Sequence, residues 1–501
     1  MSGLDELSRE ELIALARGLA IENARLAERV AVLERLEAEN AELRERVARL
    51  ERLVSRNSGN SGMPPSADDL PGRPRPKDRP ARGGKRRPGK QPGSPGTALA
   101  WAEDVDPADS VDHFPAGMCV CGADLAVAAD LGVTARHQQV EIPLVVAKRL
   151  QHNLHTVACG CGKVHTAARP QGVPAAPVSL GVNLRSWCVY LMAWHAIPVH
   201  RVAELVTSLT GAEPSPGFVH GLLKRAAAAV EQANLRIRAL LTLAHVVCCD
   251  ETPIRVGPKA GPGRGSKYLL VACDRRFTWY QVGDRTLRTF TQSVIAEATG
   301  VIVHDRYQNY DSAQLGEHEH QLCCAHLLRD LQDCAETYPD AAWPGQIAEA
   351  LQGLIHAANL ARAQGRDTLP AGTRAMWTRS FRHGVRIGLA EVRRTPGPAK
   401  TVTQPVGRML LETLRDRQDD VLRFTSDLRI PPTNNQAERD LRPAKTQQKI
   451  SGRLRSERAT QHRYAVRGYL STAAKHGVDL LTAIRESLLG RPWMPPDPAP
   501  A

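Results

Sequence analysis

The sequence predicts a multidomain α+β protein, and three features of the chain lead to this prediction. Its 501 residues exceed the roughly 250–300 residues that a single hydrophobic core usually serves. The N-terminal segment has the seven-residue apolar period of a coiled coil. Further along, residues 241–334 read as short apolar strands separated by turns, with helical patterns before and after them. We therefore expect several folded segments along one chain.

The composition favours a protein with hydrophobic cores and a polyanionic partner. Hydrophobic residues make up 42% of the chain and charged residues 24%. The formal net charge is +13, and residues 73–90 carry nine basic residues against one acid. Such runs are often only solvated linkers, but together with the overall excess they favour nucleic acid. The chain has no run of about 18 uncharged apolar residues, so no membrane span is predicted. The acidic, polar N-terminus is not a secretory signal, so the eleven cysteines are expected to be reduced thiols or metal ligands.

Residues 1–55 are predicted to form a coiled coil that joins copies of the chain. Apolar residues recur every seven positions, most regularly from Leu33 to Val54. The polar Asn40 at an inner position favours a two-stranded parallel pairing, because its amides bond only in register. The alternative is one long amphipathic helix that packs on its own chain. Residues 56–100, rich in Ser, Asn, Gly, Pro and basic residues, are expected to form a disordered linker.

Residues 101–175 are predicted to form a small zinc-binding domain. Two Cys-x-Cys pairs, each followed by glycine, offer four thiolates for tetrahedral zinc: Cys119 with Cys121, and Cys159 with Cys161. His165 is an alternative ligand, and the other interpretation is four metal-free cysteines in turns. Between the pairs, residues 136–159 alternate apolar and polar side chains as in a β-hairpin.

Residues 176–240 are predicted to contain a helix–turn–helix. An apolar helix is followed by a break at Pro198, a helix over His200–Leu209, a Thr-Gly turn and another helix after Ser215. The last of these helices is the candidate for reading the major groove of DNA. Many helical pairs of this kind have no connection with DNA, so the pattern alone leaves both readings open.

Residues 241–334 are predicted to form an α/β core, followed by a helical segment over 335–430. The runs that indicate strands are 245–256, 267–283 on both sides of a turn, and 300–311, and a short strand leads into a helix over 320–334. Breaks in the helical segment are expected at 364–372 and 393–400.

Two of the predicted strands end in an acid, Asp250 and Asp305. Carboxylates at strand ends are held rigidly and are reached by solvent, and with a third carboxylate they can hold two Mg²⁺ ions. Each acid alone is more often a turn former or a helix cap. The third candidate is Glu438, in the final segment 431–490, where a helix is expected from Asn434 with Thr433 as its cap.

That helix combines a carboxylate with amides and guanidinium groups, which suits a metal site beside DNA phosphates. Asn434 and Glu438 are expected to share one face of it, with arginines on a neighbouring face. The residues expected to contact DNA are Asn434, Asn435, Arg439, Arg442 and Lys445.

Four segments together resemble the insertion sequence 66 family of DDE transposases: "SRNSGNSGMPPSAD", "CDETPIRV", "HDRYQNYD" and "NNQAERDLRPAKTQQKISGRLRS". The resemblance covers most of the chain in order and implies a ribonuclease-H-like core that a helical insertion interrupts before the final acid. The family's three acids fall on Asp250, Asp305 and Glu438. The chain departs from the family pattern in its Cys-x-Cys spacing and in Arg306, where relatives often have glycine. That arginine is expected either to approach phosphate or to point away from it.

The resemblance implies metal-dependent cleavage of DNA at inverted-repeat ends, followed by strand transfer into target DNA. The implied cofactors are two Mg²⁺ or Mn²⁺ ions at the acids, and Zn²⁺ at the cysteines. The implied partners are double-stranded DNA, further copies of the chain and accessory proteins of the same element, with no membrane and a location in the bacterial cytoplasm at the nucleoid. His326 has no evident partner and is expected to be structural or to contact DNA.

Two alternatives share some of these features. A ribonuclease-H-like nuclease or resolvase would use the same acids to cut DNA without joining it. A domesticated DNA-binding regulator would keep the helix–turn–helix with an inactive core, although acids at all three positions argue against this.

Overall fold

The computed structural model describes residues 8–55, 99–142, 144–258, 267–397 and 402–497. The predicted linker over 56–100 lies almost wholly outside the described residues. The chain divides into two compact units. The smaller unit comprises Asp78–His152 with Thr207–Ala212, and the larger one comprises the rest. No helix in the described part of the chain is long and apolar enough to cross a membrane.

The smaller unit has little regular structure among its described residues. It contains two short 3₁₀ turns, η2 (Pro107–Asp109) and η3 (Leu125–Val127), each opened by an aspartate whose side chain accepts a backbone N–H. The predicted hairpin over 136–159 is wrong, because the described residues from 136 to 155 form no strand. Their apolar side chains, such as Val140 and Leu144, are exposed. A segment of alternating apolar and polar residues forms a stable strand only where it can pair with a neighbouring strand and pack its apolar side chains into a core.

A shorter hairpin belongs to the larger unit. Strands β1 (Thr156–Ala158) and β2 (Val164–Thr166) pair antiparallel on either side of the second cysteine pair.

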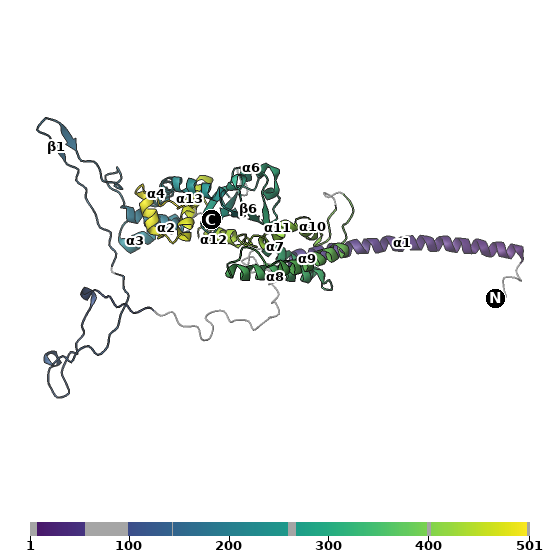
Figure 1. The fold of residues 1–501 in the computed structure, drawn as a ribbon, viewed down its shortest axis with the longest axis horizontal. Coiled ribbons are helices and arrows are strands. Elements are labelled where there is room, and N and C mark those ends of the chain that lie inside the picture. The colour runs from purple at the N-terminus through teal and green to yellow at the C-terminus, as the bar shows by residue number, and fades with distance from the viewer. Residues whose placement is uncertain (1–7, 56–98, 143, 259–266, 398–401, 498–501) are drawn as a thin grey trace. The chain divides into compact units, whose positions relative to one another are not determined.

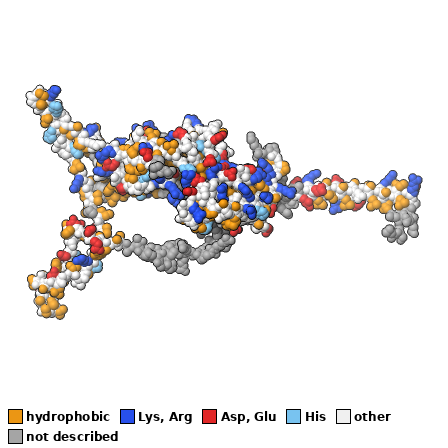
Figure 2. All heavy atoms as spheres, in the orientation of Figure 1, with side chains coloured by type: hydrophobic (Ala, Val, Ile, Leu, Met, Phe, Trp, Pro, Cys, Tyr) orange, Lys and Arg blue, Asp and Glu red, His pale blue; other side chains and the backbone are white. Residues whose placement is uncertain are grey.

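The N-terminal segment forms one helix, α1 (Arg9–Ser55). Figure 2 shows hydrophobic side chains along it among acidic and basic ones. Its apolar heptad residues are 40–65% exposed, including Leu12, Leu33 and Val54. A helix of this length with an exposed apolar seam has no internal core to stabilise it, so the prediction of a paired coiled coil stays open.

The centre of the larger unit is a mixed five-stranded sheet in the order β5-β4-β3-β6-β7; Figure 1 labels its strand β6. Its strands are β3 (Val246–Ile254), β4 (Lys267–Cys273), β5 (Thr278–Asp284), β6 (Val301–His304) and β7 (His320–Leu322). Strand β4 runs antiparallel to both of its neighbours, whereas β3, β6 and β7 run parallel. The predicted strand positions and the turn between β4 and β5 are confirmed.

Alternate residues of the strands enter two different cores, as a two-residue period requires. On one face, Cys248, Val271 and Val303 pack with helices α7 (Cys324–Thr337) and α12 (Asn435–Ile450). On the other face, Cys249 and Ile302 pack with a second set of helices and 3₁₀ turns. Those helices are α5 (Glu231–Thr242), α6 (Leu287–Thr291), η4 (Val294–Glu297), η5 (Gln308–Asp311) and η6 (Ala313–Leu315). Both faces of the sheet are therefore covered.

The predicted helical segment is confirmed. It contains α8 (Trp343–Ala363), α9 (Ala371–Glu391), α10 (Arg408–Asp416), α11 (Gln418–Leu422) and η7 (Arg423–Thr425). Helices α8 and α9 lie side by side (Figure 1). The first expected break, 364–372, falls between them.

The helices expected in the DNA-binding region form one core with the last helices of the chain. Helices α2 (Val182–Ala193), α3 (Val199–Thr210) and α4 (Pro216–Ala229) pack with α13 (Glu457–Lys475) and α14 (Leu480–Leu488). Ser215 caps α4 as expected, because its hydroxyl accepts the N–H of Phe218. Since α13 also contacts β5, this bundle is joined to the sheet.

Candidate active site

Asp250 lies within β3, opposite Val271 of β4, and Asp305 directly follows β6, which runs parallel to β3. The prediction that the first strand ends at Asp250 is therefore wrong, because β3 continues to Ile254. The last pair between β3 and β6 is Cys248 with Val303, and each aspartate lies two residues further along the chain. Because paired positions advance together on parallel strands, both side chains reach the same edge of the sheet. Asp305 also accepts the N–H of Tyr307 at 2.8 Å, which fixes the turn that follows β6.

A buried asparagine brings the third acid to this edge. The Asn434 amide donates a 2.6 Å hydrogen bond to the backbone carbonyl of Cys249, the residue before Asp250. Its backbone N–H donates to the Cys323 thiol sulfur at 3.1 Å. Both contacts fix the start of α12, and Glu438 lies one turn later. The position of Glu438 thus depends on a joint between α12, β3 and α7.

These contacts correct the prediction that Asn434 binds DNA. Its exposed fraction is 0%, so its side chain cannot reach a phosphate. The helix begins at Asn435 with Asn434 as its cap residue, one position later than expected. Helical spacing predicts which residues share a face of a helix, but the packing of the fold decides whether that face is buried or exposed.

The acids repel one another electrostatically. Burial raises the pKa of Asp250 well above its usual range, and the neighbouring carboxylates of Glu251, Asp305 and Glu438 raise it further. Among the ion pairs of the described residues, none involves Asp250 or Asp305. Asp250 and Asp305 are thus carboxylates without a paired protein cation, which suits a divalent cation, since oxygen is the ligand that Mg²⁺ prefers. The residues present therefore fit Mg²⁺ or Mn²⁺.

Glu251 is a buried acid with a different environment. Its side chain is 2% exposed, and it pairs with Arg285 at 2.5 Å and accepts the Tyr310 hydroxyl at 2.8 Å. Arg285 in turn lies over the ring of Tyr307, 3.7 Å from the centroid. Because both carboxylate oxygens have partners, Glu251 joins the segments after β5 and β6 to β3. The sequence places this acid beside Asp250 but gives no sign of these partners.

His326, in the first turn of α7, is a site residue that the sequence does not assign. Its Nε2 lies 4.0 Å from the Glu438 carboxylate, and Arg329 approaches the same oxygen at 3.4 Å. Burial lowers the pKa of His326, and Arg329 lowers it further. Glu438 is therefore the partner that the sequence does not reveal. One sequence signal could have identified His326 as a site residue: it lies in the first turn of the helix that follows β7.

Arg306 pairs with Asp330 on α7. This pair does not decide between the two expected orientations, toward phosphate or away from it.

Four expected DNA-contacting residues form an exposed basic stripe on α12. Asn435, Arg439, Arg442 and Lys445 are all exposed and have spacings of three or four residues. The opposite face of the helix is buried. Asp440, on the side toward the sheet, accepts hydrogen bonds from Lys475 at 2.8 Å and from the Thr278 hydroxyl. These contacts hold α12 against the sheet, with Arg439, Arg442 and Lys445 on its solvent-exposed face.

The candidate reading helix α4 also has basic exposed residues. His220, Lys224 and Arg225 are exposed, and the pKa of His462 on α13 is lowered by burial and then by Arg458 and Lys224. This surface therefore has a positive potential.

The two cysteine pairs lie in turns of the same form. Cys119 donates its N–H to the carbonyl of Ala123, and Cys159 does the same to Lys163, both at 2.7 Å. The glycine after each pair has a positive φ, 88° and 86°, which favours glycine at that position. Hydrogen bonds from Cys121 and Cys161 lower the pKa of Cys119 and Cys159, respectively. The two cysteine pairs belong to different compact units.

A second group of side chains that could hold a metal, His304, Asp311 and His320, is engaged in protein contacts, although His304 Nδ1 is buried without a hydrogen-bond partner among the described residues. His304 and His320 are joined by a 3.0 Å hydrogen bond, and Asp311 pairs with Arg417 at 2.8 Å.

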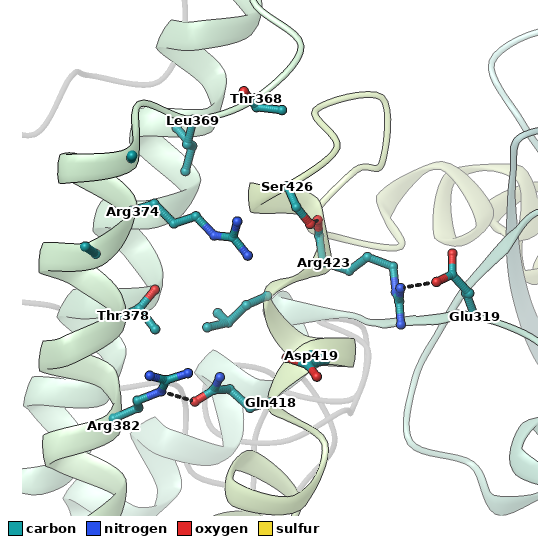
Figure 3. A pocket seen from close by; sticks show the side chains of 13 residues that line it. Glu319, Thr368, Leu369, Arg374, Thr378, Arg382, Gln418, Asp419, Arg423 and Ser426 are labelled. Carbon is teal, nitrogen blue, oxygen red and sulfur yellow. Dashed lines mark hydrogen bonds and ion pairs between the residues drawn. The ribbon is translucent and has the colours of Figure 1, made fainter.

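The helical insertion contains a groove of about 860 Å³ between α9 and the α11–η7 segment (Figure 3). Its arginines are mostly paired with neighbours: Arg423 with Glu319 at 2.6 Å, and Arg382 with the Gln418 amide oxygen. The groove thus has mixed charge and contains none of the three acids.

Comparison with known families gives two matches. Residues 178–462 match the model described as "Transposase IS66 family", which spans more than half of the chain and includes the sheet and all three acids. Residues 5–100 match a family of unknown function, DUF6444. No curated protein matches the chain.

Proposed function

Since the chain belongs to the IS66 family of transposases, we propose that it cleaves DNA at the inverted-repeat ends of an insertion sequence and transfers the strands to target DNA. The observation that supports this most is that Asp250 lies near enough to Asp305 and Glu438 for both carboxylates to raise its pKa. A sheet in which β4 alone is reversed, followed by a helical insertion and the final acid, is also what a ribonuclease-H-like core requires.

In this proposal the three carboxylates hold two divalent cations. Bound there, such ions would activate the attacking oxygen and stabilise the leaving oxygen of a phosphodiester. Asp250 and Asp305 provide oxygen atoms from rigid strands, and Glu438 closes the site from α12. Glu251 keeps the neighbouring segments in place through Arg285 and Tyr310.

The protein positions DNA with cations outside the acid cluster. The exposed stripe Asn435, Arg439, Arg442 and Lys445 lies on the helix that holds Glu438, so a phosphate bound there is aligned with the acids. Such contacts fix the register of a duplex without reading its sequence. Base reading is assigned to α4, whose exposed side chains are partly basic.

Two further proposals concern assembly. The exposed apolar seam of α1 pairs with the same helix of a second chain, which would bring two DNA ends together. Cys119, Cys121, Cys159 and Cys161 are zinc ligands, supported by their matching turns and lowered thiol pKa values.

The test is incubation of the full-length protein with DNA that carries the element's terminal inverted repeats, in Mg²⁺ or Mn²⁺. Joined products that require Asp250 and Glu438 would support the proposal. Cleavage without joining would favour a nuclease, and binding without cleavage would favour a regulator.

A further inference from the structure

The His326 imidazole lies beside the Glu438 carboxylate, too far away for a hydrogen bond but close enough for both groups to bind one metal ion. The Nε2 atom is 4.0 Å from the carboxylate oxygen, beyond the roughly 3.2 Å limit of an N–H···O bond. A cation bound about 2.1 Å from each of two ligand atoms holds them between about 3.0 Å apart, at a right angle, and about 4.2 Å apart, on opposite sides. The observed separation lies within that range.

The imidazole has one buried nitrogen and one nitrogen that faces Glu438. His326 belongs to the first turn of α7, and its Nδ1 is buried without a hydrogen-bond partner among the described residues. Nε2 is therefore the nitrogen available to a ligand. Arg329 reaches the same carboxylate oxygen at 3.4 Å, so the guanidinium and the imidazole approach Glu438 together.

Cys323 completes this group of possible ligands, but its sulfur has another role. The thiol accepts the backbone N–H of Asn434, and burial raises its pKa, so it stays protonated as part of the joint between α7 and α12. The pair that faces a cation is thus one nitrogen and one oxygen.

We propose that His326 is a ligand of the divalent cation held by Glu438, and that it gives this position a preference for transition-metal ions over Mg²⁺. Mg²⁺ selects oxygen ligands, whereas Mn²⁺ and the later ions also accept imidazole. The inference rests on the proposed function for the role of Glu438 and adds the nitrogen ligand.

The experiment uses the full-length protein and Mn²⁺ alone. Pulsed electron paramagnetic resonance of bound Mn²⁺ detects nitrogen coupling from a ligating imidazole. We expect this coupling in the native protein and its loss in His326→Ala, with Mn²⁺ affinity lowered about tenfold or more. Mg²⁺ affinity, measured by competition, should fall by no more than about threefold. The matched control is His356→Ala, an exposed histidine on α8, which should change neither signal.

Native protein that binds Mn²⁺ through Glu438 without nitrogen coupling would overturn the inference while leaving the proposed function intact, and this result needs no folded variant. Equal loss of Mn²⁺ and Mg²⁺ in His326→Ala would also overturn it. If Glu438→Ala leaves Mn²⁺ binding unchanged, the metal role of that acid fails, and the inference fails with it.

Discussion

The side-chain amide of Asn434 donates a 2.6 Å hydrogen bond to the carbonyl of Cys249, one residue before Asp250. This single contact connects the helix of the third acid to the strand of the first. The two neighbouring asparagines, Asn434 and Asn435, consequently have different roles, one buried and one exposed.

Replacing Asn434 by Ala should lower both stability and activity. The change removes a buried hydrogen bond, which costs about 1–3 kcal/mol in the free energy of unfolding, and it loosens the position of Glu438. Denaturant unfolding and a DNA-cleavage assay measure the two effects. Asn435→Ala is the control, since a surface change should stay within about 0.5 kcal/mol. Equal destabilisation by both variants would contradict this account.

The basic stripe should act through charge. Arg439→Ala and Arg442→Ala should each weaken DNA binding for all sequences and reduce the slope of log affinity against log salt by about one. Fluorescence anisotropy across a salt series measures this. Arg415→Ala, an exposed arginine on α10 paired with Asp416, should leave the slope unchanged. A loss confined to one DNA sequence would argue against phosphate contact.

The repulsion among the acids should make the metal-free protein less stable as pH rises. A carboxyl whose pKa is raised in the folded state favours its protonated form there. Its contribution is complete below the unfolded pKa, near 3.8, and is lost as pH rises through the higher folded pKa of Asp250. Asp250→Asn should therefore raise the Tm of metal-free protein at pH 7, more than at pH 4. Added Mg²⁺ should raise the Tm of the native protein and not that of the variant. A variant that melts below the native protein at pH 7 would contradict this.

The exposed seam of α1 should determine the oligomeric state. Leu33→Glu with Leu36→Glu places charges in the seam and should convert the assembly to monomers, as measured by light scattering after gel filtration. Asn40→Leu should keep the assembly but relax its two-stranded preference. A native protein that is monomeric at micromolar concentration would exclude pairing through this helix.

Zinc should accompany the cysteine turns. Metal analysis of the purified protein should find one zinc ion per chain, and Cys119→Ser should remove it. Zinc content that is the same in native protein and variant would exclude the site.

The strands of the core and the final helix could be predicted because their signals are local. Apolar runs that lead into Asp250 and Asp305 identify β3 and β6, although β3 continues past Asp250 to Ile254. The breaks around α9 follow from glycine and proline. What depends on distant partners could not be predicted. The hairpin expected before Cys159 lacks a receiving surface, and Asn434 is buried because β3 and α7 lie against it. Likewise, local patterns do not reveal that α13 completes the bundle of α2–α4, or that His326 meets Glu438 across about 110 residues.

The central claim is that Asp250, Asp305 and Glu438 form one metal-dependent site for DNA cleavage and strand transfer. Its most direct test is the joining assay with terminal-repeat DNA in Mg²⁺, comparing native protein with Glu438→Ala and with Glu457→Ala. Glu457 is an acid on α13 that pairs with Lys267. The account predicts joined products from native protein and Glu457→Ala, and a loss of at least about a hundredfold in Glu438→Ala, with DNA binding retained. Joined products from Glu438→Ala at the native rate would contradict it.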